Sequence, residues 1–224
     1  MNDYEIILSE LNKKRHCKLV EFSSKIIRTK FELIGSYSTD IKNIFKKYKT
    51  INLKSFNEFK YYEMNLIYIT YGLKQNKTIE EQIKFLLDNK DIIDCWAIVD
   101  STAKLIKTKP IKEELKMLDI LASTNEEFLI RYKYIKLFDY IAKDNFKIIF
   151  NNIINSEFYY VLMGEARLLA ECFIMYPDDT FLFIKNSEID NKIKLKTISK
   201  ICDSYRVHDE DKLKVKELRN TLKK

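Results

Sequence analysis

Glycine and proline constrain this fold most strongly, because the 224-residue chain holds only three glycines and two prolines. Strands and long loops need these residues at their turns, so a β-rich fold is excluded. Apolar side chains instead recur at steps of three and four along nearly the whole chain, which predicts helices joined by short polar turns. Gly35, Gly72 and Gly164 are also too far apart for a phosphate-binding loop or a dinucleotide-binding fingerprint.

Several helix starts carry chemical signals. Thr78 and Glu81 match a capping box, Pro110 suits the first turn of a helix, and Pro177 followed by Asp178 indicates a break and an acidic first turn. In chain order, the pattern predicts helices at residues 3–16, 18–27, 39–48, 53–73, 78–89, 92–106, 110–122, 126–142, 145–154, 158–176, 178–185, 191–205 and 209–222.

About a dozen helices without a long linker suit one continuous layer of helix pairs. We therefore expect a single all-α domain over residues 1–224, a helical-repeat solenoid of antiparallel helix pairs with a concave face. An irregular helical bundle is the alternative. The alternation of residues 192–196 would also suit a strand, but its helical neighbours favour a helix.

The net charge of +7 and the pI near 9.0 favour an anionic partner, with nucleic acid and a membrane surface as the main candidates. The excess is uneven, since residues 190–224 hold eleven Lys or Arg against six Asp or Glu. A lysine-rich solvated face explains much of this excess equally well, so charge alone does not identify DNA as the partner.

The cysteines and histidines exclude several site chemistries. Neither the four cysteines nor His16 and His208 have metal-ligand spacing, so we expect buried free thiols in a reducing compartment, without a metal or cofactor. The N-terminal residues lack the apolar core of a signal peptide, and no apolar run approaches the ~20 residues of a membrane span. We therefore expect a cytoplasmic protein with no membrane partner.

Trp96, the only tryptophan, stands four residues before Asp100 in a segment whose apolar positions have helical spacing. The two side chains should lie one above the other beside a core-facing stripe. An aromatic wall beside a carboxylate would make its charge act strongly on a ligand. The same spacing also suits a Trp96 that packs in the core while Asp100 follows it on the surface.

Motifs along nearly the whole chain resemble those of the AlkD-type DNA alkylation repair proteins. The most specific lie in the C-terminal half and read Tyr-Tyr-Val-Leu-Met at residues 159–163, Cys-Phe-Ile-Met-Tyr-Pro at 172–177 and Ser-Tyr-Arg-Val at 204–207. Upstream, Trp-Ala-Ile-Val-Asp-Ser at 96–101, Glu-Phe-Leu-Ile-Arg at 127–131 and residues 18–27 are similar to further family segments.

The resemblance implies a stack of HEAT-like repeats curved around double-stranded DNA that contains alkylated purines. It implies a monofunctional N-glycosylase that removes cationic N3- or N7-alkylated purines without a deep base pocket, in base excision repair, and we expect a monomer. Asp100 would be the catalytic carboxylate, Trp96 would form a wall against the sugar, and Arg131 would hold a DNA phosphate.

Two positions depart from the family pattern. Arg167 stands where the family usually has a second tryptophan, and Ile130 precedes Arg131 where the family often has paired arginines. Arg167 would contact a DNA phosphate, point toward Asp100, or form an i,i+4 pair with Glu171 on the surface.

Three functions stay open from sequence. The first is the glycosylase. The second is a family member that binds damaged or unusual DNA with little or no catalysis, which Arg167 favours and the retained Trp96 and Asp100 oppose. The third is a helical-repeat scaffold for protein partners, for which the basic charge would be incidental. A concave basic surface that exposes Trp96 and Asp100 would separate the first two from the third.

Overall fold

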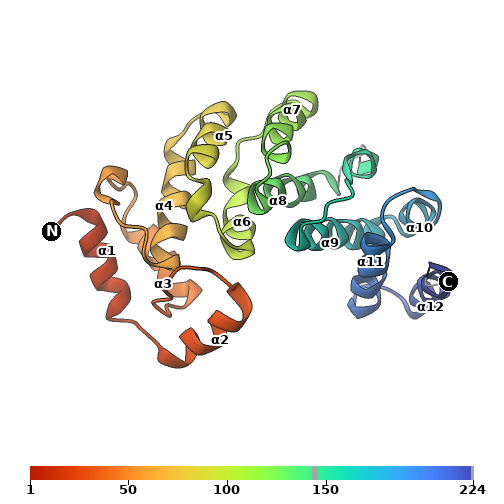
Figure 1. Ribbon diagram of the computed structural model, residues 1–224, viewed down its shortest axis with the longest axis horizontal. Coiled ribbons are helices and arrows are strands. Elements are labelled where there is room, and N and C mark those ends of the chain that lie inside the picture. Colours follow the sequence, from red (N-terminus) through yellow and green to blue (C-terminus); the bar gives the residue numbers. More distant parts are fainter. Residues whose placement is uncertain (143–145, 223–224) are drawn as a thin grey trace. The chain divides into compact units, whose positions relative to one another are not determined.

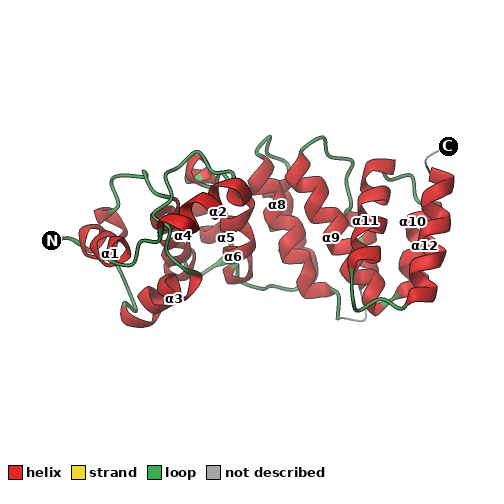
Figure 2. Ribbon diagram, turned by 90° about the horizontal axis from the view of Figure 1, so that it is seen from below, coloured by secondary structure: helices red, strands yellow, loops and turns green. Residues whose placement is uncertain are grey.

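The computed structural model describes residues 1–142 and 146–222. Within them the regular structure is helical and no strand forms, so the predicted all-α fold is confirmed (Figure 1, Figure 2). The chain divides into two compact units, Met1–Tyr132 and Lys133–Lys224, and the division falls inside helix α8 (Glu127–Lys136). The single-domain expectation stays a prediction.

Seven α-helices and three short 3₁₀ helices form the described structure of the first unit before α8. They are α1 (Asp3–Asn12), α2 (Cys17–Ile27), α3 (Ser38–Lys47), η1 (Leu53–Ser55), α4 (Tyr62–Gln75), α5 (Ile79–Asp88), η2 (Lys90–Ile92), α6 (Trp96–Thr102), η3 (Ala103–Leu105) and α7 (Ile111–Ala122). Helix α4 is buried on most of its sides, and it packs against α5 and α6.

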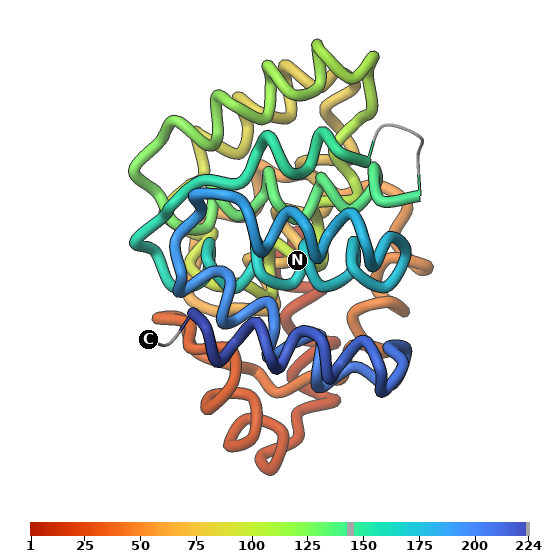
Figure 3. The backbone as a smooth tube through the Cα atoms, turned by 90° about the vertical axis from the view of Figure 1, so that its right-hand side faces the viewer, coloured from red at the N-terminus to blue at the C-terminus, as the bar shows by residue number. Residues whose placement is uncertain are grey.

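After α8, the described residues of the second unit form four α-helices and three 3₁₀ helices. They are η4 (Leu137–Tyr140), η5 (Phe146–Ile148), η6 (Phe150–Asn152), α9 (Tyr159–Met175), α10 (Pro177–Asn186), α11 (Asn191–Asp203) and α12 (Asp209–Leu222). Figure 2 shows these helices side by side, and Figure 3 follows the backbone from cyan α9 to dark blue α12. Helix α9 packs on α10 and α11, and α11 packs on α12, which suits a helical-repeat fold.

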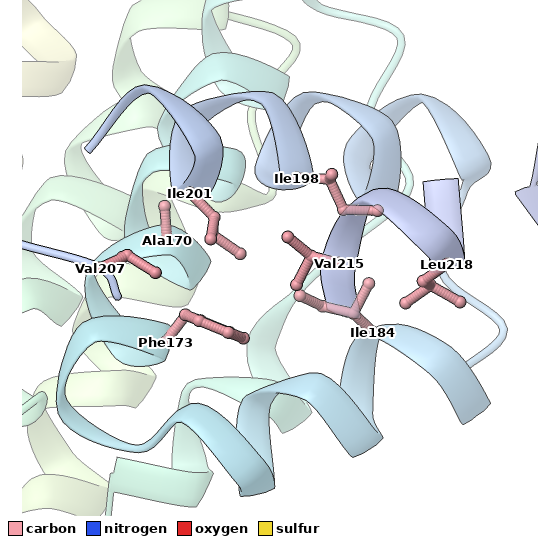
Figure 4. Packing of buried hydrophobic residues seen from close by; sticks show 8 residues of the cluster. All are labelled: Ala170, Phe173, Ile184, Ile198, Ile201, Val207, Val215 and Leu218. Carbon is pink, nitrogen blue, oxygen red and sulfur yellow. The ribbon is translucent and has the colours of Figure 1, made fainter. Parts of the chain in front are cut away.

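Apolar side chains from all four helices of the second unit meet in one core (Figure 4). Its buried members are Ala170, Phe173, Ile184, Ile198, Ile201, Val207, Val215 and Leu218. Because residues 192–196 lie in α11 and contribute to this helix's buried face, the strand alternative for this segment is wrong.

A carboxylate from α4 fixes the loop between α2 and α3 of the first unit. Glu63 is buried and accepts backbone N–H bonds from Ile34 at 2.9 Å, Gly35 at 2.8 Å and Ser36 at 3.3 Å. Gly35 has φ +85°, and a Cβ there would lie 2.5 Å from Val20 Cγ2. Only glycine fits this turn, which lets α2 return against the loop.

The predicted helices 53–73 and 145–154 do not form as single helices. Residues 53–73 do not form one helix, since Phe56 leaves the helix after η1 and packs edge-on against Tyr4, with ring centroids 5.3 Å apart. The chain then pairs with Glu32 in an isolated parallel bridge at Tyr61. The predicted helix 145–154 is replaced by the 3₁₀ turns η5 and η6, and its first residue lies outside the described residues. Tertiary packing overrides local propensity in the first case.

Helix starts agree more closely with the sequence signals. Thr78 and Glu81 form the predicted capping box, and Pro177 is the first residue of α10. Pro110 is the residue before α7 and not part of its first turn, so its predicted place was wrong by one position. Its extended backbone, with ψ 138°, suits a residue that precedes a helix.

The capping box gives a direct test of the first unit. Thr78→Ala should lower the free energy of unfolding by about 1 kcal/mol, because the N–H of Glu81 loses its acceptor. Thr78→Ser keeps the hydroxyl and should retain most of the stability. Urea unfolding of the three proteins measures the difference, and equal midpoints for the Ala and Ser variants would contradict a role for the cap.

Candidate functional site

Helix α6 begins at Trp96 because the preceding residues are held in an extended path. Asp94 accepts hydrogen bonds from Thr29 Oγ1 at 2.7 Å and from Lys30 N at 2.6 Å. Cys95 then has an extended backbone, with φ −151° and ψ 155°. The predicted helix 92–106 therefore begins as a regular α-helix only at Trp96. The predicted apolar stripe is nonetheless buried, at Ile92, Cys95, Val99, Ala103 and Ile106.

Trp96 and Asp100 are the two half-buried residues of α6, and they stand one helical turn apart. Ala97, Ile98 and Val99 between them are buried. The indole Nε1 of Trp96 donates to the carbonyl oxygen of Ile26 at 3.1 Å. The ring is therefore oriented by the end of α2, while part of it stays accessible beside Asp100.

Asp100 is held by the buried Arg131 of α8. The guanidinium Nε donates to Oδ1 of Asp100 at 2.9 Å, and the guanidinium NH2 group donates to Oδ2 at 3.1 Å. The side chain of Arg131 is 5% exposed and that of Asp100 is 16% exposed. A two-pronged pair of this kind fixes the plane of the carboxylate.

A second contact between α6 and α8 lies directly beneath this pair. The Thr102 hydroxyl donates to the Ile98 carbonyl oxygen at 2.7 Å. It accepts a hydrogen bond from the Tyr132 hydroxyl, also at 2.7 Å. Burial raises the pKa of Tyr132, so this phenol stays neutral. Adjacent residues of α8 therefore orient both the carboxylate and the helix that carries it.

The side chain of Arg131 is buried and pairs with Asp100, so it does not lie on the surface where a DNA phosphate would reach it directly. Its phosphate role stays a prediction. The pairing was missed from sequence, although a signal exists. Arg131 stands in a run with Leu129, Ile130 and Tyr132, all of which are buried, and an arginine in such a run needs an acidic partner.

Arg167 lies exposed on α9 in the second unit, with its guanidinium carbon 5.3 Å from the centre of the Phe138 ring. Glu171, its possible i,i+4 partner, accepts a hydrogen bond from Arg206 at 2.5 Å. This second arginine belongs to the Ser-Tyr-Arg-Val segment and lies beside the exposed Tyr205. The phosphate contact of Arg167 stays a prediction.

The other sequence expectations concern thiols, metals and membranes. Cys95 and Cys172 are buried, Cys202 is partly buried, and Cys17 is exposed, so the expectation of four buried thiols was wrong for Cys17. Within residues 1–142 and 146–222, no group of three His, Cys, Asp or Glu side chains is arranged to hold a metal. No helix in the same residues is long and apolar enough to cross a bilayer.

Sequence comparison identifies the family. The sequence profile of a family described as DNA alkylation repair enzyme matches residues 7–200, a range that includes Trp96, Asp100, Arg131 and Arg167. No protein with a curated description matches the chain. Because the family profile covers far more than half of the 224 residues, the chain belongs to the DNA alkylation repair enzyme family.

Proposed function

We propose that the protein is a monofunctional DNA N-glycosylase that releases cationic N3- or N7-alkylated purines from duplex DNA. Family membership supports a role in DNA repair. The observation that carries the specific reaction is the Asp100 carboxylate, which Arg131 holds in a fixed plane one helical turn from the accessible face of Trp96.

The chemistry of the lesion explains why one carboxylate is enough. An alkylated purine with a positive charge is already a good leaving group, so no general acid has to protonate it. As the glycosidic bond breaks, the sugar becomes an oxocarbenium ion, and a negative charge near the anomeric carbon stabilises it. The same carboxylate can accept a proton from the attacking water.

Each residue of the pair then has its own task. Asp100 orients the water and faces the developing positive charge. Trp96 presents a ring face that attracts cationic charge and limits the position of the sugar. Arg131 is a positioning residue, since it acts through Asp100, and we keep its contact with a DNA phosphate as part of the proposal.

The proposal is tested by incubating purified protein with N-methylated duplex DNA and measuring free base by chromatography. We expect release of methylated purines and abasic sites without strand cleavage, because no step requires an amine nucleophile. Intact lesions after prolonged incubation with an excess of protein would contradict the reaction. Strand cleavage that accompanies base release would contradict the monofunctional assignment.

One observation favours a second function, which is binding of damaged or unusual DNA with little catalysis. The guanidinium of Arg131 contacts both oxygens of Asp100 and offsets part of the carboxylate's field. Arg167 also replaces the aromatic side chain that the family resemblance leads us to expect. Under this alternative the protein would protect or mark alkylated DNA and would not excise the base.

Arg167→Trp separates the two functions. The substitution restores the expected ring, so excision should stay equal or rise, measured as single-turnover release of methylated purine. Arg167→Gln is the control, because it removes the charge without adding a ring. If wild-type protein releases no base and only the Trp variant gains activity, the native chain is a DNA-binding protein. If excision fell in the Arg167→Trp variant but not in Arg167→Gln, an aromatic side chain at this position would not support the reaction.

A further inference from the structure

A small pocket on the first unit is lined by three lysines from three different elements. Lys42 comes from α3, Lys74 from α4 and Lys104 from η3. All three are exposed, and none forms an ion pair with a carboxylate anywhere in residues 1–142 or 146–222. Lys74 Nζ lies 4.8 Å from the centre of the Phe45 ring. Three lysines therefore line one pocket without a carboxylate that pairs with them.

A second pocket shows that other lysines of α3 do pair with carboxylates. That pocket, between α1 and α3, is lined by Lys14 and Lys47 among others, and it contains their acidic partners. Lys14 pairs with Asp40 at 3.1 Å, and Lys47 pairs with Glu10. The lining of the three-lysine pocket contains no Asp or Glu, so its positive charge is available to a ligand.

The remaining lining combines hydroxyls with apolar walls. Ser38 and Ser101 are hydroxyl residues of the lining, while the Thr70 hydroxyl donates to the Leu66 carbonyl oxygen at 2.7 Å. Phe45 and Leu66 are among its apolar residues. The cavity volume is about 290 Å³, at the low end of the roughly 300–1,000 Å³ of small-molecule sites. There is room for one small ligand with an anionic end and an apolar body.

We propose that this pocket binds a nucleoside monophosphate group, with its phosphate among Lys42, Lys74 and Lys104 and its sugar and base against the apolar walls. A single phosphate accepts several charge-assisted hydrogen bonds from ammonium groups and hydroxyls. Asp100 and Arg131 do not line the pocket, although Ser101 follows Asp100 in the chain. The pocket is therefore a site separate from the proposed excision chemistry.

Titration of the full-length protein with dAMP tests the proposal by calorimetry. We expect one molecule of dAMP per chain, bound more tightly than deoxyadenosine or deoxyribose 5-phosphate, because each of these lacks one half of the contacts. The variant Lys42→Gln/Lys104→Gln should lower dAMP affinity at least about tenfold, as two charge-assisted contacts are lost.

Lys46→Gln/Lys107→Gln is the matched control. It removes the same charge from α3 and from the residues just after η3, but these lysines do not line the pocket. Its dAMP affinity should stay within about twofold of wild type, because exposed charges that do not contact the ligand act on it only through high-dielectric water. Equal losses in both double variants would overturn the proposal, and so would equal affinity for dAMP and deoxyribose 5-phosphate or no dAMP binding at millimolar concentration.

Competition with an undamaged DNA duplex identifies the source of the nucleotide. If the duplex displaces dAMP, and the pocket variant binds duplex more weakly than the control variant, the site takes a nucleotide of a DNA strand. If dAMP and duplex bind together, it takes a free nucleotide. Either result supports the pocket. None of these measurements uses an alkylated base, so failure here leaves the proposed glycosylase untouched.

Discussion

Asp100→Asn is expected to lower the excision of a cationic purine by roughly 10² or more, the scale seen when one preorganised electrostatic group is removed. The substitution keeps the size of the side chain but removes the charge that faces the oxocarbenium ion. Duplex affinity should survive or rise slightly, because contacts to phosphates carry binding and a repulsive carboxylate is lost. Single-turnover base release and a binding titration at the same salt concentration measure both effects.

The pair with Arg131 makes a fold control necessary for this variant. A buried guanidinium that loses its anionic partner destabilises the protein, so unfolding must be measured beside activity. Asp91→Asn is the matched control, since Asp91 is an exposed carboxylate in η2, shortly before α6. It should retain most of the excision rate. An Asp100→Asn protein that is folded and excises as fast as wild type would exclude the proposed mechanism.

Glu165→Gln is expected to stabilise the second unit at alkaline pH. Glu165 is buried in α9, where desolvation raises the pKa of its carboxyl to about 8, against the opposing effects of the Ile154 N–H, the Tyr134 hydroxyl and the charge of Lys133. The folded state therefore keeps a proton that the unfolded chain releases near its ordinary pKa of 4.5. The contribution of Glu165 to the free energy of unfolding is fully present below pH 4.5, and it is lost as the pH rises to about 8.

The loss across that window is roughly 3 to 5 kcal/mol for wild type. Glutamine is neutral at every pH and keeps an acceptor for Ile154 N, so the variant should match wild type near pH 4.5 and exceed it above pH 8. Urea unfolding at a series of pH values measures the difference. Glu157→Gln, an exposed carboxylate of the same unit, should change stability by less than about 0.5 kcal/mol. Identical pH profiles for Glu165→Gln and wild type would contradict a buried titrating carboxyl.

Local sequence signals predicted the helices well where the chain's own neighbours decide the structure. The capping box at Thr78, the acidic first turn after Pro177 and the buried stripe around Val99 all follow from spacing. The interruption at Phe56 could not be predicted, because it depends on Tyr4, which is distant in sequence. The same holds for the start of α6, which Asp94 sets through Thr29.

The candidate site was predictable in part for the same reason. Trp96 and Asp100 are neighbours on one helix, so their spacing places them together. Arg131 comes from another helix, and only the packing of α8 on α6 brings its guanidinium to Asp100. Sequence periodicity places a residue on a face of its own helix but does not say which distant side chain meets it. The pair between Arg131 and Asp100 was missed for this reason.

Helix α2 has no fully buried residue, and it contacts the rest of the unit at its ends and at Val20. His16 N bonds the Gly35 carbonyl oxygen at 3.1 Å before the helix, and Trp96 holds the Ile26 carbonyl oxygen near its end. Side chains along its outer face are thus free of packing constraints. Cys17, the exposed thiol at its first turn, is consequently a suitable attachment point for a fluorescent label that reports on ligand binding without disturbing the core.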